Sequence, residues 1–209
     1  KARMTLSKEI LNHLSQDPII EMLINKCTLR DRSAQPSVYE ALLRSISFQQ
    51  LSGASATAIH NRFLGLFPNQ YPEPSKLVTL SLETLREVGL SRQKAAYLQN
   101  TANFFLENEL METSWEDRSD ESIIELLTQI KGVGQWTVEM ILMFTLERPD
   151  ILPLDDLVVK ASIIELYQLE EWKGKALRQK LLEVAEPWKP YRTTASLYMW
   201  QWKGTKFLE

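Results

Sequence analysis

The chain has 209 residues, of which 44% are hydrophobic and 24% are charged, and its formal net charge is −3. This length and composition are typical of a globular protein with a substantial core, folded as one large domain or two small ones. The slightly acidic balance argues against binding nucleic acid through bulk positive charge, so any contact with phosphates must be local.

The chain carries one cysteine, Cys27, which excludes an internal disulfide framework and a thiolate metal or iron–sulfur site. No apolar run approaches the roughly 18 residues that span a bilayer, and the first residues lack the apolar core of a signal peptide. His13 and His60 are not spaced as metal ligands, so we expect both to be structural or surface residues. We therefore expect a soluble monomer, cytoplasmic in a bacterium or archaeon and nuclear in a eukaryote.

Helical periodicity runs along nearly the whole chain, and no pair of alternating strands flanks a hairpin signal. Residues 37–49 open with a capping box, in which Glu40 follows Ser37 by three positions. Further helices are expected over residues 52–67, 82–89, 91–107, 120–130, 134–146, 155–168, 175–185 and 192–202. About ten helices with short connections, and no repeat, predict an all-α protein folded as a compact bundle.

A tight turn, "KGVG" at residues 131–134, connects two of these helices. Gly132 and Gly134 allow positive φ and let the backbone approach another molecule closely. The N–H groups that open the second helix lack intrahelical partners and lie at the positive end of its dipole, so they form an anion site that a phosphate fits. Lys131 reinforces that site. The alternative is an ordinary helix connection stabilised by glycine.

A proline-containing link, "ERPDILPL", follows that second helix and leads to Asp155 and Asp156 at the start of another helix. Capping is the commonest reason for an aspartate at such a position. We assign capping to Asp155.

These elements, in this order, resemble the helix-hairpin-helix DNA glycosylase superfamily, in particular the 3-methyladenine glycosylase II family. The similarity rests on "SISFQQLSGASATAIHNRF", "GLSRQKAAYLQNTA", the hairpin through "LPLDD", and "PWKPYRTTASLYMW". It implies a helical subdomain at 38–148 that contains the hairpin, a second one formed by 1–37 with 149–209, and an active-site cleft between them.

The resemblance implies a monofunctional glycosylase that flips alkylated purines such as 3-methyladenine and 7-methylguanine out of double-stranded DNA. It would hydrolyse the N-glycosidic bond and so start base excision repair. The alternative is a DNA-structure-binding protein on the same scaffold, without catalysis. No cofactor is required, although the family often holds Na⁺ or K⁺ on turn carbonyls, here those of Thr128, Ile130 and Val133.

The resemblance also assigns the active-site residues. Asp156 matches the catalytic aspartate, whose negative charge stabilises the positive charge that grows on the sugar as the bond breaks. Trp136 and Trp200 match aromatic residues of the base pocket, where indole faces attract a cationic purine. Glu139 either lines that pocket or faces solvent.

The remaining assignments concern DNA contacts. Gln50 matches the residue that fills the gap left by the flipped base, where the larger bacterial relative has leucine, and Gln49 precedes it; the alternative is that Gln50 merely caps its helix. Arg92 and Lys94 match a second DNA-facing loop or form a solvated helix start, and Arg192 supports the pocket or a phosphate. The hairpin contributes Lys131, Gly132, Val133, Gly134, Gln135 and Thr137. Thr137 stands where bifunctional members carry a lysine, so no strand nicking is expected.

Overall fold

The computed structural model describes residues 4–29, 37–51 and 53–204, and over these residues it contains helices and no strand, which confirms the all-α prediction. The α-helices are α1 (Lys8–Leu14), α2 (Pro18–Lys26), α3 (Val38–Phe48), α4 (Gly53–Leu64), α5 (Pro74–Leu77), α6 (Leu82–Glu87), α7 (Arg92–Glu107), α8 (Asp120–Leu127), α9 (Gln135–Phe144), α10 (Leu157–Leu166), α11 (Gly174–Ala185) and α12 (Arg192–Trp202). Short 3-10 helices are η1 (Pro68–Gln70), η2 (Leu110–Glu112) and η3 (Glu186–Trp188). Within the described part of the chain, no helix combines the length and apolarity that crossing a membrane requires.

Tertiary contacts divide the chain into two units. Unit 1 consists of Lys1–Ala34 together with Leu142–Glu209, and unit 2 consists of Gln35–Ile141. The division falls inside α9, so the first two turns of this helix belong to unit 2 and its end belongs to unit 1.

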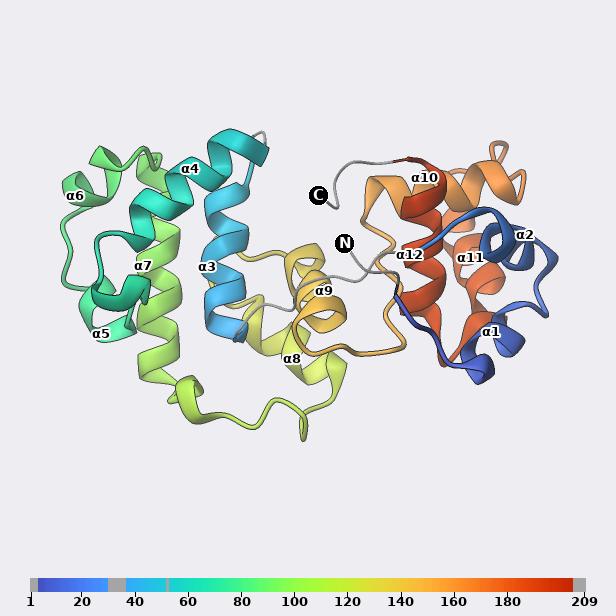
Figure 1. Ribbon diagram of the computed structural model, residues 1–209, viewed down its shortest axis with the longest axis horizontal. Coiled ribbons are helices and arrows are strands. Elements are labelled where there is room, and N and C mark those ends of the chain that lie inside the picture. The colour runs from blue at the N-terminus through green and yellow to red at the C-terminus, as the bar shows by residue number, and fades with distance from the viewer. Residues whose placement is uncertain (1–3, 30–36, 52, 205–209) are drawn as a thin grey trace. The chain divides into compact units, whose positions relative to one another are not determined.

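Unit 2 is built on α3 and α7, which pack side by side (Figure 1). Ser37 caps α3 by accepting from Glu40 N at 3.2 Å, which confirms the N-cap half of the predicted capping box, and the Glu40 carboxylate accepts from the Ser37 hydroxyl at 2.7 Å. The apolar faces of these two helices supply fully buried side chains to the core: Leu42, Ile46, Leu98, Ala102 and Phe105.

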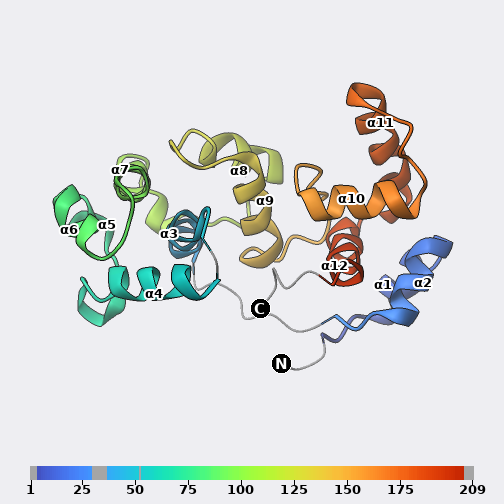
Figure 2. The ribbon, with the colours of Figure 1, turned by 90° about the horizontal axis from the view of Figure 1, so that it is seen from above.

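Unit 1 is centred on α12, whose residues 193–200 are all buried. Helix α10 lies across α12, and α2 packs against it as well (Figure 2). Asp17 caps α2 through Oδ1, while its Oδ2 accepts from Tyr167 Oη at 2.7 Å and Trp188 Nε1 at 2.9 Å. One carboxylate therefore joins the beginning of the chain to α10 and η3.

Candidate active site and DNA-contact residues

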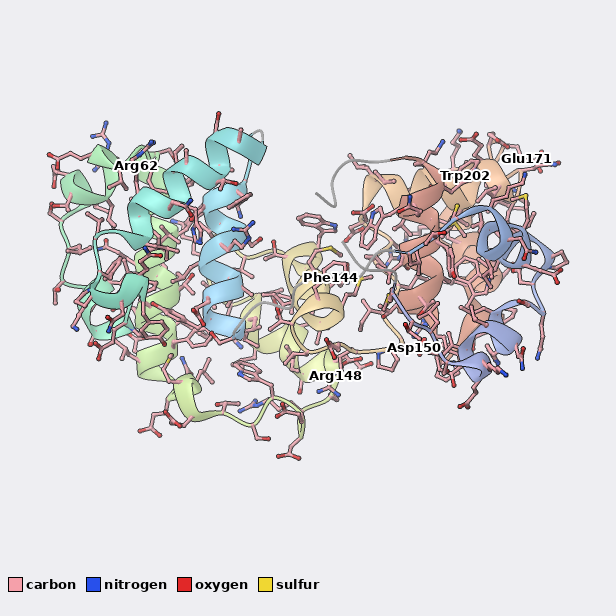
Figure 3. The ribbon with its side chains drawn as sticks, viewed as in Figure 1. Arg62, Phe144, Arg148, Asp150, Glu171 and Trp202 are labelled. Atoms are coloured by element: carbon pink, nitrogen blue, oxygen red, sulfur yellow. The ribbon has the colours of Figure 1, made fainter. Side chains whose placement is uncertain are left out.

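The link between α9 and α10 is fastened to the start of α12. The Arg192 guanidinium donates to both carboxylate oxygens of Asp150, at 2.7 Å and 2.9 Å. Thr193 Oγ1 donates to Arg148 O at 2.7 Å and accepts from Ile151 N at 3.0 Å. Figure 3 marks Arg148 and Asp150 on this link. These bonds fix the path by which the chain reaches Asp156.

Asp156 is the N-cap of α10 and is 8% exposed. Its Oδ1 accepts three hydrogen bonds, from Val158 N at 3.0 Å, Val159 N at 2.9 Å and Trp200 Nε1 at 2.9 Å. Three donors on one oxygen hold the carboxylate in a single orientation at the positive end of the helix dipole.

The prediction that Asp155 caps this helix is wrong, because the helix begins one residue later than expected. Asp156 N donates to Pro153 O at 3.0 Å, which closes a turn and directs the second aspartate, not the first, at the helix amides. The Asp155 side chain is 60% exposed and lies 4.0 Å from Arg178 Nη1, a contact of little energetic value at the surface.

Trp200 lies beneath Asp156 instead of presenting an open indole face. It is 3% exposed, and its ring packs on Phe144 with centroids 5.8 Å apart. The resemblance assigned Trp200 to the base pocket, and in the structure its indole N–H donates to the Asp156 carboxylate.

Trp136 and Glu139 belong to unit 2 and lie on α9. Trp136 is 43% exposed, so its indole is accessible to a ligand. Glu139 is 5% exposed and accepts from Gln135 Nε2 at 2.9 Å, so the alternative that it faces solvent is wrong. The Gln135 side chain is therefore turned along the helix toward this carboxylate.

The hairpin turn requires glycine at one of its two glycine positions. Gly132 has φ +100°, and a Cβ there would come within 2.3 Å of the Tyr97 ring. Gly134 does not adopt a left-handed conformation, contrary to the expectation, and a Cβ there would meet nothing within 4 Å. The described residues thus leave the space beside the Gly134 Cα open.

The start of α9 has the form expected of an anion site. Its first helical bond runs from Val138 N to Gly134 O at 3.2 Å, so the amides of Gln135 and Thr137 precede the helical ladder. Lys131 is exposed beside the turn, whereas the side chains of Val133 and Thr137 are 6% and 5% exposed. Any contact of Val133 or Thr137 with DNA is therefore made through the backbone.

The turn after α3 places Gln50 at its apex. Gln50 is exposed and has φ +56°, a conformation that non-glycine residues seldom adopt. The C-cap of α3 is Gln49, so the alternative that Gln50 caps the helix is wrong. Gln49 Nε2 donates to Gly132 O at 3.1 Å, which turns this side chain toward the protein. Leu51 is 40% exposed beside Gln50, and the sequence interpretation overlooked it.

Two of the four cationic residues expected to contact DNA or support the pocket, Lys94 and Arg192, have partners within the protein. Lys94 Nζ donates to Ser47 O at 2.9 Å, and burial lowers the pKa of this amine. Arg192 is committed to Asp150, so it supports the link and does not extend toward a phosphate. Arg92, the first residue of α7, is exposed.

Two supporting residues escaped the sequence interpretation. Tyr97 lies against Gly132. Arg62 of α4, labelled in Figure 3, donates from Nε to Val88 O at 2.9 Å and braces the turn that precedes α7. Neither has a local sequence signal, because each acts on a segment distant along the chain.

Comparisons with known proteins show which family the chain resembles. Residues 43–187 match the HhH-GPD superfamily base excision DNA repair protein family. DNA-3-methyladenine glycosylase 1 of Schizosaccharomyces pombe is 37% identical over 165 residues, covering 78% of this chain and 71% of the relative. Alkylbase DNA glycosidase-like protein mag2 of the same yeast is 34% identical over 181 residues, covering 85% and 83%.

A solved structure of the S. pombe 3-methyladenine DNA glycosylase, in complex with abasic DNA, superimposes with a TM-score of 0.77 at 34% identity and covers 95% of this chain and 98% of that one. The similarity in sequence and the similarity in fold therefore both extend over most of the chain. The chain belongs to the HhH-GPD superfamily of base excision DNA repair proteins.

Proposed function

We propose that this protein is a DNA-3-methyladenine glycosylase, which excises alkylated purines such as 3-methyladenine and 7-methylguanine from double-stranded DNA. The observation that carries the proposal is the carboxylate of Asp156, nearly buried and fixed by three N–H donors. The relatives named as 3-methyladenine and alkylbase glycosylases support the same substrate class.

The chemistry follows from a fixed negative charge. As the bond from C1′ to the base stretches, positive charge grows on the sugar, and the Asp156 carboxylate stabilises it. The alkylated purine is cationic before the bond breaks, so it leaves as a neutral base without further protonation. Water then adds to C1′ and gives a proton to Asp156, which returns it to solvent.

DNA is held through local features of unit 2, which suits a protein with a net charge of −3. Phosphate binds the amides that open α9, with Lys131 adding charge. Gln50 fills the gap left by the flipped base, and the exposed indole of Trp136 stacks on the cationic purine. Arg92 adds a backbone contact from the start of α7.

The hairpin turn also carries backbone carbonyl oxygens that would coordinate a monovalent cation. Thr128, Ile130 and Val133 offer neutral carbonyl oxygens, the ligand type that suits hard cations. Ile130 O accepts from Val133 N at 3.0 Å and retains a second lone pair that could coordinate a cation. The three carbonyl oxygens are therefore ligands of a type that Na⁺ or K⁺ accepts. Bound there, Na⁺ or K⁺ would add positive charge near the phosphate. Its role is to support the turn and not to take part in the chemistry.

The proposal is tested by incubating purified protein with methylated duplex DNA and measuring free bases by chromatography. We expect release of 3-methyladenine and 7-methylguanine, leaving abasic sites. Tight binding to the same DNA with no base released, at any enzyme concentration, would instead identify a DNA-structure-binding protein and refute the glycosylase.

A further inference from the structure

One side-chain hydrogen bond connects the two DNA-facing turns of unit 2. Gln49 Nε2 donates to Gly132 O at 3.1 Å, across 83 positions of sequence. Gln49 is the C-cap of α3 and immediately precedes Gln50, while Gly132 lies in the hairpin turn. This bond thus holds Gln49, the residue before Gln50, against the hairpin turn.

The α3 side of this connection is firmly held. Lys94 Nζ donates to Ser47 O at 2.9 Å, and Ser47 Oγ donates to Leu43 O at 2.8 Å. His60 Nδ1 lies 3.2 Å from the same hydroxyl oxygen, and the Ser47 side chain is fully buried. The last turn of α3 therefore cannot shift without breaking these bonds, and the first exposed residue beyond it is Gln50.

The hairpin side has the same support. Gly132 lies against the ring of Tyr97, whose hydroxyl accepts from Gln93 Nε2 at 2.6 Å. Tyr97 and Lys94 are both on α7, so one helix backs the hairpin turn and the end of α3. The Gln49 amide closes this arrangement by joining the two turns directly.

We propose that Gln49 is a positioning residue that couples Gln50 to the hairpin, so that gripping the DNA backbone and filling the gap of a flipped base occur together. Gln50 has φ +56°, and such a conformation persists where the surroundings hold it. The Gln49 amide is committed to Gly132, so Gln49 acts on DNA through Gln50. This inference rests on the proposed function, because it assigns Gln49 to lesion recognition.

The test compares Gln49→Met, which keeps the side-chain length and removes the donor, with Gln99→Met as matched control. Gln99 makes the same kind of bond in the same unit, from Nε2 to Leu80 O at 2.7 Å, away from both turns. The probes are a duplex with one tetrahydrofuran abasic-site analogue and an undamaged duplex of the same sequence. The quantity measured is the ratio of the two dissociation constants.

We expect Gln49→Met to reduce the preference for the analogue duplex roughly two- to twelve-fold, the range for one hydrogen bond, with little change on undamaged DNA. Gln99→Met should keep the wild-type preference. In a Gln50→Ala background, Gln49→Met should cause no further loss, because the residue through which it acts is gone.

An equal loss on both duplexes would show that Gln49 contacts DNA directly, and an unchanged preference would show that the bond has no role; either overturns the inference. Base release by the wild type is measured in parallel. Normal release combined with an unchanged preference in Gln49→Met overturns this inference alone, whereas absent release overturns the proposed function.

Discussion

Trp200 holds the carboxylate of Asp156 through its indole N–H, at 2.9 Å and across 44 positions of sequence. The indole is 3% exposed and is backed by Phe144, so it cannot swing away. A residue that sequence similarity assigns to the base pocket thus supports the carboxylate that we propose is catalytic.

Trp200→Phe should lower kcat by about 10- to 100-fold, as expected for a lost hydrogen bond to a charged group, while KM changes little. Phenylalanine keeps the contact with Phe144 and removes only the donor. Single-turnover base release measures the chemical step, and Trp202→Phe is the matched control. A rise in KM with unchanged kcat would show that Trp200 binds the base instead.

Asp156→Asn should reduce base release at least about 100-fold while fold and DNA affinity are kept. The amide oxygen can still accept the three N–H bonds, and asparagine is an equally good N-cap, so only the charge is lost. Asp155→Asn, one residue earlier and exposed, should retain wild-type activity. Equal activity in the two variants would remove Asp156 from the mechanism.

Lys131→Ala should weaken binding to damaged and undamaged duplexes alike and reduce the slope of log affinity against log salt by about 1. Lys131 is exposed beside the amides that we propose bind phosphate. A contact with a phosphate does not depend on which base is present. Gln50→Ala should instead weaken binding to the abasic-site analogue and leave the salt slope unchanged. Identical behaviour of the two variants would contradict their separate roles.

The product should be an intact strand with an abasic site, broken only after alkali or an added endonuclease. Strand cleavage through an imine requires an amine at C1′, and α9 carries no lysine between Gln135 and Phe144. Thr137 is 5% exposed, and its hydroxyl cannot form an imine. Borohydride should trap no protein–DNA adduct, and a strong band abolished by a lysine substitution would refute this.

Stability should fall as the pH drops from 6.5 toward 4, in part because of His60. Burial, with a smaller contribution from Arg44, lowers the pKa of His60 to about 4. The pKa of His60 in the folded protein lies below its value of about 6.5 in the unfolded chain. Protonation of His60 therefore favours the unfolded state. It lowers the free energy of unfolding by up to about 3 kcal/mol as the pH falls from 6.5 toward 4, and has no effect above that range.

The free energy of unfolding in urea, measured at pH 7 and pH 4.5, tests this. His60→Gln should show a smaller decrease than the wild type, whereas His13→Gln, at a partly exposed position, should match the wild type. An equal decrease in all three proteins would show that His60 does not titrate in this range.

The local features of the fold were predictable from the sequence because their causes are local. The capping box at Ser37 and Glu40 lies within one helical turn, and helical periodicity indicated α3, α7 and α12. The short helices η1 and α5 lie between the helices that periodicity indicated. Short helices of this kind give too few periods to recognise.

Contacts between distant segments could not be predicted. The path of the link before α10 depends in part on the Asp150–Arg192 pair, whose members are 42 positions apart. Lys94 resembled a solvent-facing cation at a helix start, yet Ser47 O, 47 positions away, lies within its reach. Positive φ at Gly134 was inferred from residue type alone, and the turn needs it only at Gly132.

The two-segment construction of unit 1 affects the order in which the protein folds during synthesis. Unit 2 is one continuous stretch, Gln35–Ile141, and can fold once it has left the ribosome. Asp17 must wait for Trp188, 171 positions later, so this hydrogen bond forms only after that residue has been made. The second segment of unit 1, which carries Asp156, follows unit 2 in the chain, so the hairpin turn can fold before the surroundings of Asp156 are complete.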